Sequence, residues 1–555
     1  PVNYPRFEFA HHVIKRLHAG VRSRNLAPYR AFARDVVRFA DRIDIQNPSV
    51  FRAVLGQTRE QLQQQGLQSM VARKAMALVL QAIDHQTGLK AYPTQIIAAA
   101  IMLDNGLAEM QTGEGKSLAI LLAAGTAALS GIPVHVITAN DYLAQRDAEA
   151  AEKISLLLEL DTGSINPEMD RDQRRKAYSR DIIFCTAKEL VFDYLRDKSD
   201  KQSPVNHLQA LAQSITQPGK TEPPVLRGLY FAIVDEADSI LLDEAMTPFI
   251  LSKQGKTRLN TEHYRFALTL AARLQKNTHY TILNRSRSLH LTEQGVQQVA
   301  QDSQNKGGLW QVHRFRTHLI EQALSALHLF QADRDYLIKD DEIQIIDAVT
   351  GRLAEGRKWS QGIHQLLELK ENLELTDDLE QMAKITYQQF FPRFLKLGGT
   401  SATVHEDHVE LNQTYSLPVI KVPLRLPCQR QILPTRLFCH SPQKWADIVQ
   451  RTLAVQAGGQ AILIAVESVE DSHQLSRQFE QHKIRHVVLN ARQDAEEAEI
   501  IAQAGQPGSV TVATNMAGRG TDIKLSPQVL KAGGLHIICS HLNDSKRIDR
   551  QVQGR

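Results

Sequence analysis

A glycine-rich stretch, EMQTGEGKSLAI at residues 109–120, is the first place where residue types and spacing could do chemistry. Gly113 and Gly115 allow the backbone to curl so that successive N–H groups point at phosphate oxygens. Lys116 adds a positive charge for the β- and γ-phosphates, and Ser117 offers a hydroxyl to Mg²⁺. The apolar residues that follow predict a helix whose positive end faces the phosphates. Because a methionine stands where the general pattern has its first glycine, a glycine-rich turn without a ligand stays an alternative.

A second candidate is the stretch FAIVDEADSILLDEA at residues 231–245, where a hydrophobic strand ends on two acidic residues. Asp235 is placed to hold Mg²⁺, directly or through water, and Glu236 to orient or deprotonate an attacking water. The alternative is a strand followed by an acidic helix N-terminus, which the helix dipole favours in any protein. A phosphate loop upstream on the same predicted sheet makes the catalytic interpretation the stronger one.

Two arginines near the end of the chain could reach a γ-phosphate. Arg519 lies between two glycines in VATNMAGRGTDIKL, and Arg555 follows a glycine in RIDRQVQGR. Arginines with this task must be presented rigidly by loops at the end of a sheet. Each could alone be a surface arginine, but two such loops on a second sheet predict a nucleotide clamped between two domains. Hydrolysis would then depend on domain closure.

The elements that must position these residues follow from the hydrophobic pattern. From about residue 70, short β-branched runs alternate with longer helical stretches, which predicts parallel strands covered by helices. A second series of this kind begins near residue 440. Residues 252–345 interrupt the rhythm with two predicted hairpins and a helix, which indicates a domain inserted in the first. The Gln-, Ser- and Pro-bearing residues 200–227 predict an inserted loop.

Composition bounds the class of protein. The chain has 555 residues, more than one core usually supports, and 43% of them are hydrophobic, as in ordinary globular proteins. The net charge of +4 is too small on this length to indicate nucleic acid by itself. Residues 6–42 are rich in arginine and form either a solvated helical face or an arm for acidic lipid or a partner. Four cysteines without zinc-ligand spacing fit a reduced, cytosolic compartment, and no signal peptide is visible.

Several long motifs together resemble one family, SecA, the motor ATPase of bacterial preprotein export. DEAD and SAT, which stand literally in the sequence, are shared with DEAD-box proteins, but the longer motifs are typical of SecA. These motifs are AEMQTGEGKS, VITANDYLAQRD, FDYLRD, VDEADSILLDEAMTPFI, TGRLAEGRKWSQGIHQ, ATNMAGRGTDI, GGLHII and RIDRQVQGR. The resemblance runs from about residue 70 to the end.

The resemblance implies an α/β fold of two RecA-like parallel-sheet motor domains with an inserted α+β substrate-clamp domain and a helical N-terminal segment. We expect the N-terminal segment at 1–68 and the first nucleotide-binding domain at 69–251 and 346–405. The insertion at 252–345 is similar to the family's preprotein-crosslinking domain. An incomplete second nucleotide-binding domain would occupy 406–555.

The resemblance also implies a site for ATP and Mg²⁺. Gln95, in YPTQ, matches the family's adenine-recognising glutamine, and Asp522 falls on a nucleotide-binding position. The nucleotide-binding residues would be Gln95, Thr112, Gly113, Glu114, Gly115, Lys116, Ser117 and Asp522. The metal ligands would be Ser117 and Asp235. The catalytic residues would be Asp235, Glu236, Arg519 and Arg555.

The partners implied by the resemblance are an unfolded preprotein, a SecY-type translocation channel and an anionic membrane lipid surface. A β-edge in the clamp could hold many sequences through backbone hydrogen bonds. The protein would be cytoplasmic and peripheral at the cytosolic face of the inner membrane. A DEAD-class RNA or DNA helicase is one alternative, but an aromatic content of 6% and the clamp-like insertion argue against nucleic acid as a partner. An incomplete nucleotide-binding paralogue without transport activity is the other.

The motifs depart from the family pattern at a few positions. Gln111, Met246 and Gln553 stand where the family usually has arginine, and GGTSAT at 398–403 and HLND at 541–544 also differ. The phosphate and metal residues keep the pattern, so we expect ATP binding, while the departures fit a divergent paralogue. The first residue is proline, and the family's further Gly-Arg, helical scaffold and zinc tail would follow the last one. We therefore expect a fragment.

Overall fold

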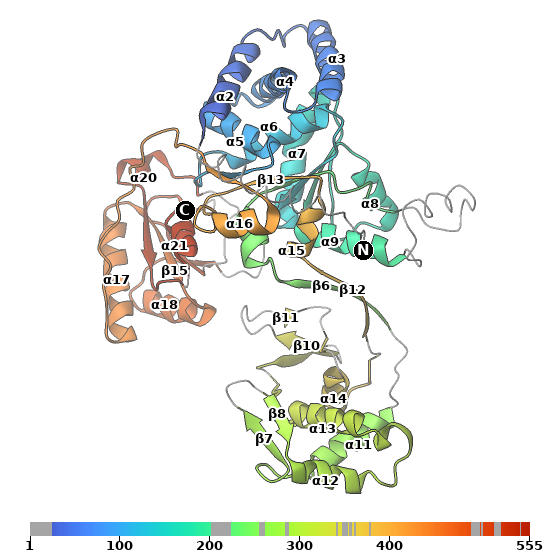
Figure 1. The fold of residues 1–555 in the computed structure, drawn as a ribbon. Helices are drawn as coiled ribbons and strands as arrows, with labels where there is room; N and C mark the ends of the chain where they lie inside the picture. Colours follow the sequence, from blue (N-terminus) through green and yellow to red (C-terminus); the bar gives the residue numbers. More distant parts are fainter. Residues whose placement is uncertain are drawn as a thin grey trace, which may run out of the picture. The chain divides into compact units, whose positions relative to one another are not determined.

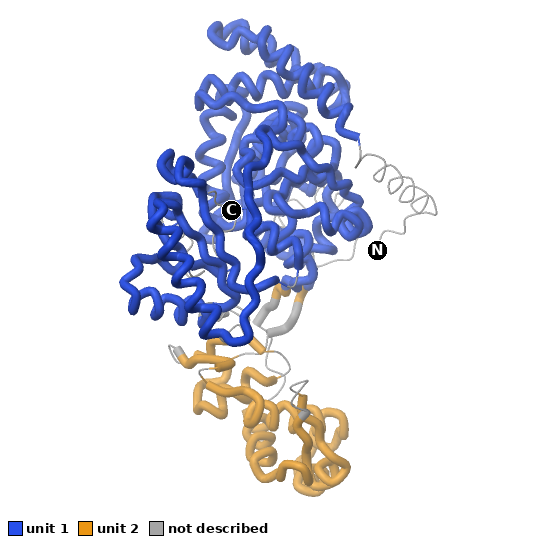
Figure 2. The backbone as a smooth tube through the Cα atoms, turned by 90° about the vertical axis from the view of Figure 1, so that its left-hand side faces the viewer, with its two compact units in different colours: residues 1–249, 384–555 blue, residues 250–383 orange. Residues whose placement is uncertain are grey.

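The computed structural model describes residues 25–554 with interruptions. The interruptions are residues 201–223, 255–260, 284–287, 333, 340–341, 347–352, 355–357, 360–361, 377–378, 490–499, 501–502, 515–522 and 544. Two compact units divide the chain, one made of residues 1–249 and 384–555 and the other of residues 250–383 (Figure 2). Among the helices of the described ranges, none is both long enough and apolar enough to cross a bilayer.

The larger unit contains a seven-stranded sheet in the order β14-β1-β13-β5-β2-β4-β3, whose neighbouring strands run parallel. The strands are β1 (Leu107–Glu109), β2 (Val134–Thr138), β3 (Thr162–Ser164), β4 (Ile182–Thr186), β5 (Phe231–Val234), β13 (Lys396–Ser401) and β14 (Val419–Lys421). β2, β4 and β5 are buried along their whole length. Burial on both faces explains why they occur in the sequence as continuous apolar runs. The prediction of a parallel sheet is confirmed.

Helices pack around this sheet (Figure 1). They are α5 (Pro93–Leu103), α6 (Lys116–Leu129), α7 (Asp141–Leu157), α8 (Arg171–Tyr178), α9 (Ala187–Asp200), α15 (Tyr387–Phe390) and α16 (His408–Tyr415). Two short helical turns, η1 (Ser239–Asp243) and η3 (Phe391–Arg393), lie beside them in the chain.

The described part of the N-terminal region contains the helices α2 (Ala27–Ala40), α3 (Pro48–Gln65) and α4 (Met70–Thr87). The side chain of Asn47 caps α3, and Pro48 starts its first turn in a helical conformation. α4 lies between α2 and α3 and also packs on α6 (Figure 1). The apolar residues of these helices share one core with the sheet, so the helical N-terminal region rests on the first sheet domain.

A second parallel sheet belongs to the same unit, in the order β16-β17-β15-β18. Its strands are β15 (Ala461–Val466), β16 (Val487–Leu489), β17 (Val510–Thr514) and β18 (Leu535–Cys539). The accompanying helices are α17 (Ser441–Ala457), α18 (Val469–Gln481), α20 (Pro527–Lys531) and α21 (Lys546–Gln553). The sequence prediction of two parallel-sheet domains is thereby confirmed.

The smaller unit mixes helices with antiparallel strands. Its helices are α11 (Thr261–Ala271), α12 (Glu293–Asp302), α13 (His313–His328) and α14 (Ile363–Lys370), with a short turn η2 (Gly308–Gln311). Its strands are β7 (Tyr280–Leu283), β8 (Ser288–Leu291), β9 (Tyr336–Lys339), β10 (Glu342–Ile346) and β11 (Leu353–Ala354). β7 pairs with β8 and β9 with β10, as the two predicted hairpins require.

Two paired strands, β6 (Pro248–Gln254) and β12 (Leu379–Thr386), carry the chain into the smaller unit and back. The sequence pattern suggests that the insertion ends at residue 345, whereas the compact unit continues to Ala383. The reason is α14, because its buried Leu366 and Leu367 belong to the same apolar core as α11 and α13.

Candidate active site

The glycine-rich stretch forms the connection between β1 and α6. Gly113 and Gly115 have φ angles of +83° and +82°, which only glycine adopts without strain. Of the described residues, none comes within 4 Å of a Cβ built on Gly113, whereas a Cβ on Gly115 would lie 2.2 Å from Nε2 of Gln95. Backbone conformation therefore requires glycine at 113, and both conformation and the close approach of Gln95 require it at 115.

Helix α6 begins at Lys116, directly after the loop, with Gly115 as its N-cap. The N-cap has no side chain that could bond the first N–H groups of the helix, and these groups have no partner within a helix. Together with the helix dipole, they favour an anion at this end. α6 packs against α4 and α5, which holds its N-terminus in place.

Gln95 is buried at the start of α5 and holds the loop from the other side. Its Oε1 accepts a hydrogen bond of 2.9 Å from the Tyr92 N–H, and its Nε2 donates one of 2.9 Å to the Glu114 carbonyl. A primary amide has two N–H donors and two acceptor lone pairs, so these bonds use half of its capacity. The side chain can thus hold the loop and still contact a further polar group.

The two acidic residues come directly after β5, as predicted. Nζ of Lys116 forms an ion pair with Oε1 of Glu236, which joins the loop to the end of this strand. Oδ1 of Asp235 accepts a hydrogen bond of 2.9 Å from the Glu236 N–H. Glu236 has a φ of +47°, which non-glycine residues adopt rarely. Such strain persists only where the surroundings enforce it, and it is frequent at functional sites.

The charges at this point are unbalanced. Burial and the carboxylate of Glu236 raise the pKa of Asp235 to about 7, although Lys116 acts to lower it. Burial acts to lower the pKa of Lys116, but attraction by Glu236 and Asp235 raises it above its usual value, so this side chain stays a cation. Asp235 and Glu236 are two adjacent carboxyl groups, and Lys116 supplies one ammonium group beside them. A further cation would therefore be attracted to this point. Oxygen ligands and excess negative charge fit Mg²⁺, and the exposed Ser117 hydroxyl lies one residue after Lys116.

Helix α21 of the second sheet domain contacts the first domain through Arg547. This guanidinium is buried and forms ion pairs with Asp238, Asp243 and Asp407, of which those with Asp238 and Asp407 measure 3.3 Å. Asp238 belongs to the DEAD sequence and also accepts a hydrogen bond of 2.8 Å from the hydroxyl of Thr403 in the SAT sequence. These contacts join three motifs that lie far apart in the chain.

The end of α21 lies at the phosphate loop. A Cβ built on Gly554 would be 3.7 Å from Oγ1 of Thr112. One turn earlier, Arg550 forms ion pairs with Glu406 and, at 3.2 Å, with Glu109, which immediately precedes the loop. The second domain therefore meets the first beside its glycine-rich connection.

The structure brings most of the predicted site residues together and leaves three outside. Gln95, the loop residues 112–117 and the pair Asp235 and Glu236 lie around one point, whereas Arg519, Asp522 and Arg555 lie outside the described residues. Sequence reasoning missed the inter-domain partners of α21. The available signal was the spacing of two arginines in RIDRQ and the acidic run that follows SAT. The missed residues are Glu109, Asp238, Asp243, Glu406, Asp407, Arg547 and Arg550.

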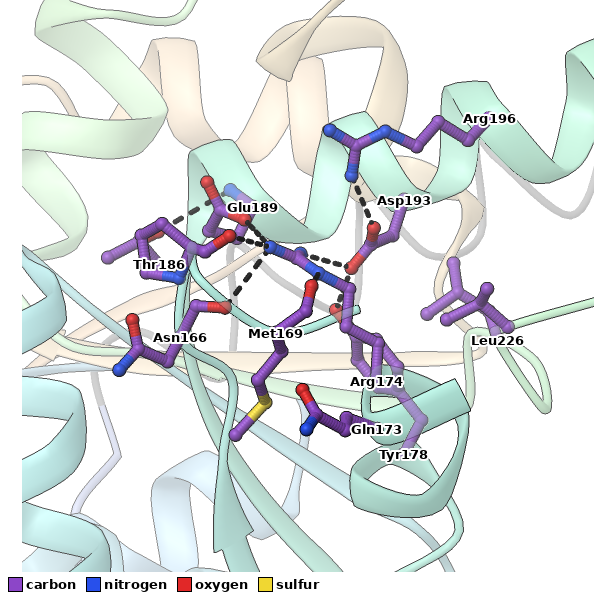
Figure 3. A network of polar contacts seen from close by, with 12 residues as sticks. Asn166, Met169, Gln173, Arg174, Tyr178, Thr186, Glu189, Asp193, Arg196 and Leu226 are labelled. Carbon is purple, nitrogen blue, oxygen red and sulfur yellow. Dashed lines mark hydrogen bonds and ion pairs between the residues drawn. The ribbon is translucent and has the colours of Figure 1, made fainter. Parts of the chain in front are cut away.

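A separate buried polar network surrounds Arg174 of α8 (Figure 3). Its guanidinium points between Glu189 and Asp193 of α9, at 2.7 and 3.0 Å, and also donates to the backbone carbonyls of residues 166, 167 and 169. Asp193 further accepts a 3.0 Å hydrogen bond from the Tyr178 hydroxyl. Asp197 accepts bonds of 2.8 Å from two backbone N–H groups at 225 and 226. The FDYLRD motif thus supplies carboxylates that fasten α9 to its neighbours.

Comparisons with known proteins agree with these features. The SecA DEAD-like domain model matches residues 14–412 and the SecA P-loop domain model residues 427–529. Protein translocase subunit SecA 2 of Nitrosospira multiformis is 41% identical over 526 residues, 95% of this chain and 79% of that protein. Protein translocase subunit SecA of Oleidesulfovibrio alaskensis is 36% identical over 551 residues, 98% of this chain and 60% of that protein.

A solved structure, S. cerevisiae Dbp5 bound to RNA and ADP BeF3, covers 86% of this chain and 90% of its own, with 12% identity and a TM-score of 0.38. This likeness is too slight to bear on function. The family models and the translocase relatives cover most of the chain at high similarity. The chain therefore belongs to the SecA family of protein-translocation ATPases.

Proposed function

We propose that this chain is an ATP-driven motor that binds unfolded preprotein and pushes it through a SecY-type membrane channel. ATP would bind at the phosphate loop, between the two parallel-sheet domains. The observation that carries this proposal is the convergence of the loop, the DEAD sequence and the end of α21 at one point. Domain closure around the nucleotide would then be coupled to movement.

The residues have separate tasks in this proposal. The N–H groups of residues 113–117 hold the phosphates, Lys116 neutralises their charge, and Gln95 contacts the adenine. Ser117 and Asp235 would hold Mg²⁺, which would supply positive charge beside the phosphates. Glu236 orients or deprotonates the attacking water. The remaining nucleotide contacts from the second domain come from Arg519, Asp522 and Arg555.

The Lys116–Glu236 ion pair gives this scheme an order of events. Without nucleotide, each side chain neutralises the other. A γ-phosphate competes for Lys116, which releases Glu236 to act on water. Glu236 is therefore free as a base only when ATP is present.

The smaller unit would be the substrate clamp, and the site of action would be the cytosolic face of the inner membrane. β9 is an edge strand of the described sheet β11-β10-β9, and its Leu337 and Ile338 are exposed. An edge strand can bind an extended peptide through its backbone groups. Arg30 and Arg34 lie exposed on one face of α2, which suits an anionic lipid surface.

Two substitutions test the nucleotide site. We expect Lys116→Ala to abolish binding of a fluorescent ATP analogue in a titration, and Glu236→Gln to keep binding but stop phosphate release. Lys153→Ala, at an exposed position of α7, is the matched control and should change neither. Equal ATP binding by wild type and Lys116→Ala would show that the phosphate loop is assigned wrongly, and normal turnover by Glu236→Gln would remove Glu236 from its role.

A DEAD-class RNA or DNA helicase and a paralogue without transport activity are the competing functions. Filter binding with single-stranded RNA distinguishes the helicase from the proposed preprotein motor. We expect weak binding and no stimulation of hydrolysis, whereas tight, salt-sensitive binding with stimulated hydrolysis would favour the helicase. The paralogue without transport activity is distinguished by a second assay, in which vesicles carrying the SecY-type channel and an unfolded preprotein are added. These additions should stimulate ATP hydrolysis by a transport motor and should not stimulate hydrolysis by such a paralogue.

A further inference from the structure

The scheme above gives no task to Glu109, although this carboxylate is buried directly before the phosphate loop. Its side chain is 2% exposed. Oε2 accepts hydrogen bonds of 3.1 and 2.6 Å from the N–H groups of Val404 and His405, in the loop after β13. Oε1 accepts one of 3.2 Å from Nη2 of Arg550. Arg550 is thus the partner that the second sheet domain supplies to this buried group.

Arg550 also reaches a second carboxylate. Its Nη1 bonds Glu406, which lies in the same loop as the backbone groups that hold Glu109. Partial burial acts to raise the pKa of Glu406, but the hydrogen bond and positive charge of Arg550 lower it below its usual value. One guanidinium on α21 therefore bridges the strand that enters the phosphate loop and the loop that follows the SAT sequence.

The position of Arg550 along α21 gives the bridge a consequence. Residues four apart lie on the same face of a helix, so Arg550 and Gly554 face the same way. Gly554 lies beside Thr112 of the phosphate loop. Arg547, nearly one turn before Arg550, fixes the other end of the helix in its own group of carboxylates. Arg550 therefore links the end of α21 that meets the phosphate loop to the first sheet domain.

We propose that Arg550 is a positioning residue for ATP hydrolysis, which holds the end of α21 against the phosphate loop by bridging Glu109 and Glu406. The inference rests on the proposed function, because it matters only if the residue after Gly554 acts on the γ-phosphate. Arg550 itself touches no nucleotide in this proposal. Its loss should therefore slow the chemical step and leave nucleotide affinity nearly unchanged.

The size of the effect follows from how positioning works. A misplacement of about 1 Å at a reacting centre can cost on the order of 100-fold in rate. A complete loss of an arginine that stabilises the γ-phosphate costs about 10³- to 10⁵-fold. Because Arg547 still anchors α21 in an Arg550→Ala variant, we expect a fall in kcat of about 10- to 100-fold.

The experiment compares the full chain with Arg550→Ala, Arg550→Lys and the control Arg451→Ala, an exposed arginine of α17 in the same domain. Steady-state hydrolysis of Mg²⁺-ATP gives kcat and KM, and titration with fluorescent ADP gives affinity. Arg550→Ala should lose kcat with KM and ADP affinity within about 3-fold of wild type. Arg550→Lys should recover part of the loss, because one ammonium can still reach a carboxylate.

Hydrogen exchange of α21 provides a readout that does not depend on turnover. In wild type, a non-hydrolysable ATP analogue should slow exchange of residues 546–553, and in Arg550→Ala this protection should be lost. If Arg550→Ala kept the wild-type kcat and the wild-type protection of α21 from hydrogen exchange, the inference would be overturned and the proposed function would stand. Equal losses of kcat, ADP affinity and melting temperature would also overturn it, because they indicate a structural role. A wild-type chain that binds no ATP would overturn the proposed function and this inference together.

Discussion

The contact between Gly115 and Gln95 allows a matched test of the phosphate loop. Gly113→Ala and Gly115→Ala place the same methyl group at nearly the same φ, +83° and +82°. Among the residues that the structure describes, only the second methyl group meets a neighbour, because its Cβ would lie 2.2 Å from Nε2 of Gln95. The difference between the two variants therefore isolates the collision from the backbone strain.

The magnitudes can be worked out from these contacts. The left-handed conformation costs an alanine about 1–2 kcal/mol. In the free protein the loop can relax, so nucleotide binding has to restore the strained form, and affinity falls by about 5- to 30-fold in Gly113→Ala. In Gly115→Ala, the side chain of Gln95 must also move and loses its bonds to Tyr92 and Glu114. At about 1 kcal/mol for each bond, affinity falls a further ~30-fold.

Titration with fluorescent ADP measures these losses, and melting curves show whether each variant is folded. The double variant Gln95→Ala with Gly115→Ala completes the test, because removing the glutamine amide removes the collision. We expect its loss of affinity to be clearly smaller than the sum of the two single losses. Equal affinities of Gly113→Ala and Gly115→Ala, or strict additivity in the double variant, would refute the reasoning.

Two further predictions concern stability. Arg174→Met should lower the free energy of unfolding by about 3–5 kcal/mol, because it leaves the carboxylates of Glu189 and Asp193 without this partner in a buried network. Arg175→Met, at a half-exposed side chain of the same helix, should change the free energy of unfolding by less than about 1 kcal/mol. Urea denaturation followed by circular dichroism measures this, and equal effects of the two variants would contradict it. His135 lies buried between Tyr178 and Phe394, and burial with the charge of Arg227 lowers its pKa to about 4. The imidazole binds a proton near pH 6.5 in the unfolded chain but only near pH 4 in the folded protein. The free energy of unfolding is therefore highest above pH 6.5 and falls as the pH approaches 4, with a loss of about 2 kcal/mol at pH 5. Urea denaturation at pH 7.5 and at pH 5 gives the change in the free energy of unfolding between the two pH values. We expect this change to be smaller in His135→Gln than in wild type, and an equal change would show that another group dominates.

Local signals made the phosphate loop and the DEAD strand predictable. The glycines at 113 and 115 and the acids at 235 and 236 stand next to the elements that position them, so their geometry depends on a few neighbouring residues. The strands could be predicted for a similar reason, because burial on both faces requires continuous apolar runs such as that of β15.

The inter-domain contacts could not be predicted in the same way. Glu109 and Arg550 are separated by 441 residues, and nothing near either one shows that they meet. The spacing of Arg547 and Arg550 indicates one charged helix face but leaves its partners open. The sequence pattern placed the end of the insertion at residue 345 because the leucines of α14 would suit the core of either unit, and only the folded chain shows which core they join.

The way in which the smaller unit is inserted has a consequence for how such a protein can change. β5 and β13 are neighbours in the central sheet, with Val234 opposite Gly399, although the whole of residues 250–383 separates them in sequence. The chain leaves and returns through the paired strands β6 and β12. A segment whose two ends lie side by side can be exchanged without changing the order or pairing of the strands in the sheet that receives it. Recombination could therefore replace residues 250–383 as one piece, changing what the smaller unit binds while the phosphate loop and its sheet are inherited unchanged.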